Sequence, residues 1–233
     1  MATTDAGLWC VVPAAGRGAR VGSAVPKQYL PIAGKPLLLH TLGRLAAHPC
    51  IAGLMVVLAA EDALWPGLHE IAGKPILTAT GGAERADSVL AGLRALRGKV
   101  EDSQFTLVHD AARPCIHAAD ISRLIEQGIR AGGALLAAPV RDTLKRADTQ
   151  GRVAATEPRE ARWRALTPQL FRCGELIAAL ESARAAGIAV TDEAMAMEHM
   201  GHKPLLVEGS EDTIKVTTSA DFALAEFLLA RMD

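Results

Sequence analysis

The chain has 233 residues, half of them hydrophobic, and a formal net charge of −1 at pH 7. This length and composition are enough to bury a sizeable core, either in one domain or in two small ones. The near-zero charge argues against a general affinity for nucleic acids or membranes. The longest apolar run, residues 51–60, is about half as long as a membrane-spanning helix requires.

The cysteines and the N-terminal residues predict a soluble cytoplasmic protein. Cys10, Cys50, Cys115 and Cys173 are far apart and form no Cys-x-x-Cys motif. We therefore expect buried thiols in a reducing compartment rather than disulfides or a zinc site. The first seven residues lack the basic stretch before an apolar run that is typical of a secretory signal.

The first half of the chain alternates between short apolar runs and helical patterns. Buried strands are predicted at residues 8–13, 54–59, 75–78, 105–109 and 134–138, and helices at 36–48, 84–97 and 119–131. This alternation predicts an α/β fold with a mostly parallel sheet and helices on both faces. In such folds ligands bind at the carboxyl ends of the strands.

Residues 141–164 interrupt this rhythm. Two short alternating stretches, 143–147 and 152–156, flank a turn at 148–151 and predict an exposed β-hairpin arm. An isolated hairpin is marginally stable in water, so we expect the arm to pack on a second copy of the chain; the alternative is a flexible surface loop. After the arm we predict further elements at 167–171 (strand), 174–186 and 191–200 (helices), 204–208 (strand) and 219–231 (helix).

A loop rich in small residues follows the first predicted strand. Consecutive backbone N–H groups of such a loop can cradle phosphate oxygens, and two cations, Arg20 and Lys27, follow it. A dinucleotide-binding fingerprint fails because Val21 stands where its third glycine belongs, and the Walker motif fails because Pro36 follows Gly-Lys. A plain turn is the alternative to a phosphate site. The residues predicted to bind the phosphates of a nucleotide are Ala14, Ala15, Gly16 and Gly18.

Two further motifs follow predicted strands. Residues 81–88 pair two glycines with Ser88, whose hydroxyl suits a base or ribose edge; the same stretch also suits the first turn of a helix. Asp110 ends a strand and is a candidate Mg²⁺ ligand, or else caps the next turn. Its neighbour His109 is expected to be structural, and no pair of histidines has the spacing of a zinc site.

Seven motifs, in order along nearly the whole chain, resemble the 2-C-methyl-D-erythritol 4-phosphate cytidylyltransferases. They are PAAGRGAR with PKQYL (13–20 and 26–30), GGAERADSV (81–89), VHDAARP (108–114), APVRDT (138–143), LTPQ (166–169), TDEA (191–194) and IKV (214–216). The resemblance implies a single Rossmann-like nucleotidyltransferase domain over residues 1–233, with residues 141–164 as an inserted β-arm for dimerisation and acceptor binding.

The resemblance also implies a reaction. CTP and 2-C-methyl-D-erythritol 4-phosphate would give 4-diphosphocytidyl-2-C-methyl-D-erythritol and pyrophosphate, with Mg²⁺ as cofactor, in the non-mevalonate route to isoprenoid precursors. No protein nucleophile is needed, because a phosphate oxygen of the acceptor attacks the α-phosphorus. Catalysis of this kind is mostly positioning and charge neutralisation.

The resemblance assigns roles to individual residues. Gly82, Ala83 and Ser88 would hold the cytidine, and Arg159 with Lys215 would hold the phosphate of the acceptor. The rest of the acceptor would be surrounded by Asp110, Arg113, Thr143, Thr167 and Thr191, and Asp110 would also bind the metal. Arg20 and Lys27 suit the α-phosphate and the leaving group by their charge. Without the resemblance, Arg159 is one of several arm cations, and Lys215 is the exposed lysine of a strand that contains Ile214 and Val216.

Other functions are weighed against this one. A cytidylyltransferase for another polyol phosphate, such as ribitol 5-phosphate, would share the CTP half of the site. A nucleotide-binding regulator without catalysis is opposed by the retained charged residues Arg20, Lys27, Asp110, Arg159 and Lys215. An NAD-dependent oxidoreductase fails at the missing third glycine.

Overall fold

The central element of the fold is an eight-stranded sheet, seen in a computed structural model that describes residues 7–16 and 25–232. Its strand order is β12-β8-β11-β7-β1-β4-β6-β5. In chain order these strands are β1 (Leu8–Pro13), β4 (Ile51–Leu58), β5 (Glu70–Ile71), β6 (Lys74–Thr80), β7 (Phe105–Val108), β8 (Ala134–Pro139), β11 (Trp163–Arg172) and β12 (Leu205–Glu208).

Most of the sheet is parallel, as the alternation of strands and helices predicted. β7, β1, β4 and β6 run parallel, and so do β12 and β8. β11 is antiparallel to both of its neighbours, β7 and β8, and β5 is antiparallel to β6. Because β7, β1 and β6 point the same way, the loops that follow them meet at one edge of the sheet.

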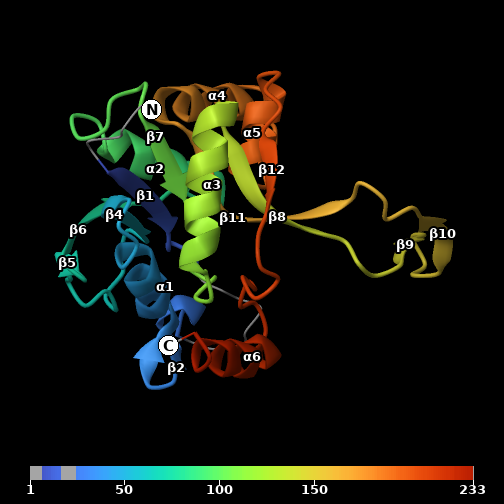
Figure 1. Ribbon diagram of the computed structural model, residues 1–233, viewed down its shortest axis with the longest axis horizontal. Coiled ribbons are helices and arrows are strands. Elements are labelled where there is room, and N and C mark those ends of the chain that lie inside the picture. The colour runs from blue at the N-terminus through green and yellow to red at the C-terminus, as the bar shows by residue number, and fades with distance from the viewer. Residues whose placement is uncertain (1–6, 17–24, 233) are drawn as a thin grey trace.

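Helices cover both faces of the sheet (Figure 1). On one face α1 (Leu37–Ala46) and α3 (Ala118–Ala131) pack with residues such as Cys10 and Val12 of β1. On the other face α2 (Arg85–Ala95), α4 (Cys173–Ala185) and α5 (Glu193–His199) pack with Val11, because successive side chains of a strand point to opposite faces. A third, smaller cluster places α6 (Ser219–Leu229) against the pair β2 (Pro31–Ile32) and β3 (Lys35–Pro36).

Close packing of α2 on the sheet depends on a glycine. A Cβ built on Gly92 would lie 2.7 Å from the side chains of both Val11 and Val57. The helix therefore approaches β1 and β4 more closely than any larger residue at this position would allow. The first turn of the same helix lines the site described below.

The predicted arm is present as an antiparallel hairpin of β9 (Leu144–Ala147) and β10 (Val153–Glu157). Figure 1 shows it projecting far from the sheet. Within the described stretch 141–162 no residue is buried, and Val153 is 66% exposed. The arm therefore has no core of its own.

Three sequence-based expectations need correction. Residues 163–164 belong to β11 and pair with β8, so the arm is shorter than predicted. Lys215 lies in an irregular segment rather than a strand: the N–H of the next residue, Val216, donates to the carbonyl of Ala112 in the loop after β7, and no strand ladder includes Lys215. Cys50 is exposed, because it lies in the turn before β4, whereas the other three cysteines are buried free thiols.

No helix among the described residues is long and apolar enough to cross a membrane.

Candidate active site

A pocket of about 300 Å³ lies at the carboxyl ends of β1, β6 and β7. Residues that follow these three strands line it, at 13–16, 82–85 with Ser88, and 110–112. Lys27, Gln28 and Lys215 complete the lining. The pocket therefore lies at the sheet edge where the sequence motifs predicted a ligand.

The two glycine-containing loops touch each other behind the pocket. A Cβ on Gly81 would lie 2.7 Å from the Cβ of Ala15 and 2.7 Å from the Oγ of Ser88, so there is no room for a side chain. The Ser88 hydroxyl accepts a hydrogen bond from the N–H of Gly82 at 3.2 Å and donates one to the carbonyl of Glu84 at 3.1 Å. Ser88 thus shapes the loop that is predicted to hold the base.

Residues 27 and 28 form a single turn of 3₁₀ helix with Tyr29 and contact the described residues on either side of the pocket. The buried amide of Gln28 donates to the carbonyl of Ala14 at 2.7 Å. The ammonium of Lys27 donates to the carbonyl of Val216 at 2.8 Å, so it lies beside the segment that carries Lys215. Lys27 therefore contacts the residue that follows Lys215, and both lysines line the pocket.

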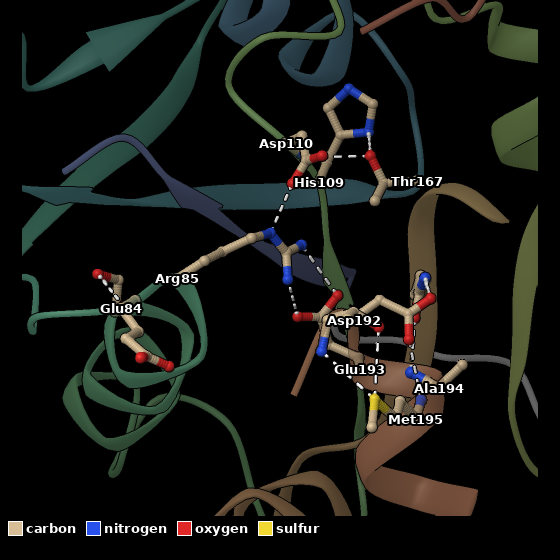
Figure 2. A network of polar contacts seen from close by, with 12 residues as sticks. Glu84, Arg85, His109, Asp110, Thr167, Asp192, Glu193, Ala194 and Met195 are labelled. Atoms are coloured by element: carbon tan, nitrogen blue, oxygen red, sulfur yellow. Dashed lines mark hydrogen bonds and ion pairs between the residues drawn. The ribbon is translucent and has the colours of Figure 1, made fainter. Parts of the chain in front are cut away.

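Asp110 is the centre of a network of charges, of which Figure 2 shows the part that Arg85 forms with Asp110 and Glu193. Its Oδ1 is 2.8 Å from Nε of Arg85, and its Oδ2 is 2.8 Å from Nζ of Lys215 and 3.6 Å from Nε of Arg113. Arg85 also forms two hydrogen bonds with the carboxylate of Glu193, at 2.6 and 3.1 Å. One carboxylate thus faces three cations, and one of these cations joins it to a second carboxylate.

The charges of this network keep both of its central groups ionised. Burial would raise the pKa of Asp110, but Arg85, Lys215 and Arg113 hold the pKa of this carboxyl well below its usual range. Burial would lower the pKa of Arg85, but Glu193 and Asp110 outweigh it and raise this pKa above its ordinary value. The pocket therefore presents a permanent anion within a surplus of cations, which suits a polyanionic ligand.

His109 has a structural position, in agreement with its predicted role. Its Nε2 faces the carbonyl of Arg113 at 3.0 Å, so Nε2 must carry the proton, and Nδ1 accepts from the Thr167 hydroxyl at 3.1 Å. Burial lowers the pKa of His109 to about 4, which keeps the ring neutral. The Thr167 oxygen in turn accepts from the backbone N–H of Asp110 at 3.1 Å, so this pair holds Asp110 in place.

The structure brings together about half of the predicted site residues in the pocket lining: Ala14, Ala15, Gly16, Lys27, Gly82, Ala83, Ser88, Asp110 and Lys215. Arg113 and Thr167 contact Asp110 from behind. Thr143 and Arg159 are exposed on the arm, and Thr191 is exposed before α5; none of the three lines the pocket. Gly18 and Arg20 lie outside the described residues.

Sequence reasoning missed three residues of the site. Gln28, Arg85 and Glu193 lie within the sequence motifs, but no role was predicted for them. Arg85 is 25 positions from Asp110 and 108 from Glu193, so no local spacing indicates that they form ion pairs. The position of Arg85 in the first turn of a helix that follows a glycine pair was the one usable signal.

The residues of this pocket are compatible with a Mg²⁺ ion that the phosphates of a substrate would largely hold. Among the described residues there is no cluster of three or more His, Cys, Asp or Glu side chains that could hold a metal alone. Asp110 is ionised and offers one carboxylate, and Mg²⁺ typically binds one or two carboxylates together with substrate phosphates and water.

Comparison with known proteins identifies the family. The family model described as 2-C-methyl-D-erythritol 4-phosphate cytidylyltransferase matches residues 8–231. A curated protein of that name from Stenotrophomonas maltophilia (strain K279a) is 61% identical over 97% of this chain and 98% of its own length. One from Xanthomonas campestris pv. campestris (strain 8004) is 60% identical over 97% of this chain and 86% of its own.

Solved structures agree with this result. The crystal structure of a 4-diphosphocytidyl-2C-methyl-D-erythritol synthase superposes with a TM-score of 0.83 at 36% identity, covering 96% of this chain and 98% of the other. A Francisella tularensis 2-C-methyl-D-erythritol 4-phosphate cytidylyltransferase gives 0.82 at 31% identity, covering 95% and 99%. The fold and the pocket are thus those of an α/β nucleotidyltransferase. More particularly, the chain belongs to the 2-C-methyl-D-erythritol 4-phosphate cytidylyltransferase family.

Proposed function

We propose that the pocket carries out the reaction of the family, transfer of the cytidylyl group of CTP to 2-C-methyl-D-erythritol 4-phosphate, through Lys27, Asp110 and Lys215. The observation that carries this proposal is the convergence of these three side chains on one pocket of about 300 Å³, beside the loops predicted to hold CTP. The products are 4-diphosphocytidyl-2-C-methyl-D-erythritol and pyrophosphate.

In this reaction an anionic phosphate oxygen of the acceptor forms a bond with the α-phosphorus of CTP. The bond between the α-phosphorus and the bridging oxygen to the β-phosphorus breaks, and its electron pair leaves with pyrophosphate. The protein must hold two polyanions together and neutralise the charge that grows on the α-phosphate and on the leaving group. Lys27 and, by prediction, Arg20 serve that charge, while Lys215 holds the phosphate of the acceptor.

Mg²⁺, when bound with CTP, supplies positive charge that screens the triphosphate and the leaving pyrophosphate. Asp110 is the residue we propose to hold it. Thr167 fixes the backbone of Asp110 and the neighbouring cations keep its carboxylate ionised. Its two oxygens already contact Arg85 and Lys215, so Mg²⁺ would have to share them.

Two of the predicted acceptor residues, Thr143 and Arg159, are proposed to serve a neighbouring subunit. Both lie on the arm, which has no buried residue within 141–162 and projects from the sheet (Figure 1). A homodimer in which two subunits exchange arms would bury these hairpins and bring Arg159 to a pocket. Thr191 and Arg113 are assigned to the acceptor from the same chain as Lys215.

A pyrophosphate-release assay tests the function. Each of the four nucleoside triphosphates is combined with each member of a panel of polyol phosphates, with Mg²⁺ and with a chelator. We expect release with CTP, Mg²⁺ and methylerythritol phosphate, far less with ribitol 5-phosphate, and loss on chelation that Mg²⁺ reverses. Equal or faster turnover of ribitol 5-phosphate would refute the substrate while leaving the family and the fold intact.

A further inference from the structure

We propose that Arg85 is a positioning residue that balances the charge of Asp110 and thereby leaves Lys215 available for the phosphate of the acceptor. This inference rests on the proposed role of Lys215 in acceptor binding. The side chain of Arg85 donates hydrogen bonds to both Asp110 and Glu193 (Figure 2).

The geometry divides the guanidinium of Arg85 between two carboxylates. Nη1 and Nη2 donate to the two oxygens of Glu193 at 2.6 and 3.1 Å, while Nε donates to Oδ1 of Asp110 at 2.8 Å. A guanidinium is a rigid planar fork, so the contact with Glu193 sets the direction of the Nε–H bond. Glu193 thus aims Arg85 at Asp110.

Glu193 is suited to this task because it is completely buried. Its side chain has no exposed surface, and it lies at the first position of α5, a helix that the N-cap Asp192 and the amide of Gln169 hold in place. A buried carboxylate must be paired, and Arg85 supplies the pairing through two hydrogen bonds. The position of Arg85 is therefore determined by α5 and not by the ligand.

In this arrangement Asp110 competes with the phosphate of the acceptor for the ammonium of Lys215. The ammonium of Lys215 lies 2.8 Å from Oδ2 of Asp110, so an acceptor phosphate must share or take over that ammonium. The free energy needed to move this ammonium from Asp110 to the acceptor phosphate depends on how well other groups neutralise Asp110. Arg85 contacts the other oxygen, Oδ1, and Arg113 lies farther away at 3.6 Å. Without Arg85 the carboxylate would hold Lys215 more tightly, and the acceptor would bind more weakly.

Four variants test this inference: Arg85→Met, Glu193→Gln, the double variant Arg85→Met/Glu193→Gln, and Lys215→Met as the reference. The Michaelis constants (KM) for the acceptor at saturating CTP and for CTP at saturating acceptor are measured for each variant, together with the melting temperature. A fifth variant, Arg94→Met, is the matched control, because Arg94 lies on the same helix as Arg85 and forms its ion pair with Glu181 outside the pocket.

We expect Arg85→Met to raise the acceptor KM by about tenfold or more and to leave the CTP KM within about threefold. It should also lower the melting temperature, since it leaves Glu193 buried and unpaired. Glu193→Gln should raise the acceptor KM by less than Arg85→Met does, because Arg85 remains but loses the charge of the carboxylate that directs it, and Arg94→Met should leave the acceptor KM within about threefold. In the double variant no unpaired buried charge remains, so the melting temperature should recover while the acceptor KM stays high.

The outcomes separate a positioning role from a structural one. If the acceptor KM recovers together with the melting temperature in the double variant, or if Arg94→Met raises the acceptor KM as much as Arg85→Met does, then the inference is wrong. If Lys215→Met raises the acceptor KM and neither Arg85 variant does, the inference alone is wrong. If Lys215→Met leaves the acceptor KM unchanged, the proposed role of Lys215 fails first.

Discussion

Lys27 is the residue with the clearest predicted effect on the chemical step. Its ammonium lines the pocket and donates to the carbonyl of Val216, so it is held beside the phosphates of the proposed CTP site. We expect Lys27→Ala to lower kcat by roughly a hundredfold or more and to raise the acceptor KM less, because the lost charge meets charge that grows in the transition state. Steady-state kinetics of pyrophosphate release measures both constants.

Lys203→Ala is the matched control for this experiment, because Lys203 is an exposed lysine outside the pocket. It should retain normal kcat and KM. A Lys27→Ala variant with the same kcat as this control would show that Lys27 is only a surface cation. The sequence predicts the same loss for Arg20→Ala, although Arg20 lies outside the described residues.

His48 gives a prediction about pH and stability. Its ring is buried, Nδ1 accepts from the N–H of Cys50, and Nε2 donates to the Ser122 hydroxyl, so the neutral form is the one that fits. Burial lowers the pKa of His48 below its ordinary value of 6.5. Below that value the unfolded chain binds a proton at this residue and the folded chain does not, so the stability gained from the neutral ring is lost as the pH falls.

We therefore expect the free energy of unfolding to fall as the pH drops below 6.5, and to fall less steeply in His48→Gln. Urea denaturation at a series of pH values measures this slope. Identical slopes for the two proteins would mean that His48 does not contribute to the pH dependence.

At the scale of secondary structure the arm is the element with a function to test. Each pocket would combine Lys27 and Lys215 of one chain with Arg159 of the other, if the arms exchange. Lys27→Ala and Arg159→Ala chains, each nearly inactive alone, are unfolded and refolded together. About half of the dimers should be mixed, so roughly a quarter of all sites should be intact, assuming independent sites.

Mixtures of either variant with itself are the controls and should stay inactive. If Arg159 serves the pocket of its own chain, every site in a mixed dimer keeps one lesion and nothing is restored. Activity that remains at the level of the separate variants, in samples shown to contain mixed dimers, would therefore exclude the exchange of arms.

The helices and strands were largely predictable because their signals are local. A continuous apolar run marks β1, and the period of Val89, Leu90 and Leu93 marks α2. The segment around Lys215 was wrongly expected to be a strand, because two flanking apolar residues look alike in a strand and in a loop that packs on a core. The arm was predicted from the absence of a long apolar run, and its predicted end lies two residues too far along the chain.

At the scale of the whole molecule the limits of sequence reasoning lie in long-range contacts. The rule that ligands bind at the ends of parallel strands located the pocket, and the motifs supplied most of its lining. The rule says nothing about which charges neutralise each other there. The ion pair of Arg85 and Glu193 joins α2 to α5 across 108 positions, and only the packing of both helices on the same face of the sheet brings them together.

The place where the arm leaves the sheet has a consequence for evolution. Its two ends are strands β8 and β11, which are hydrogen-bonded neighbours, with Trp163 opposite Pro139. A segment that departs and returns between adjacent strands can be lengthened, shortened or rewritten without shifting the register of the sheet. The arm can thus vary in length and sequence without disturbing the pocket of its own chain, except at Thr143 and Arg159, which are proposed to serve a neighbouring subunit.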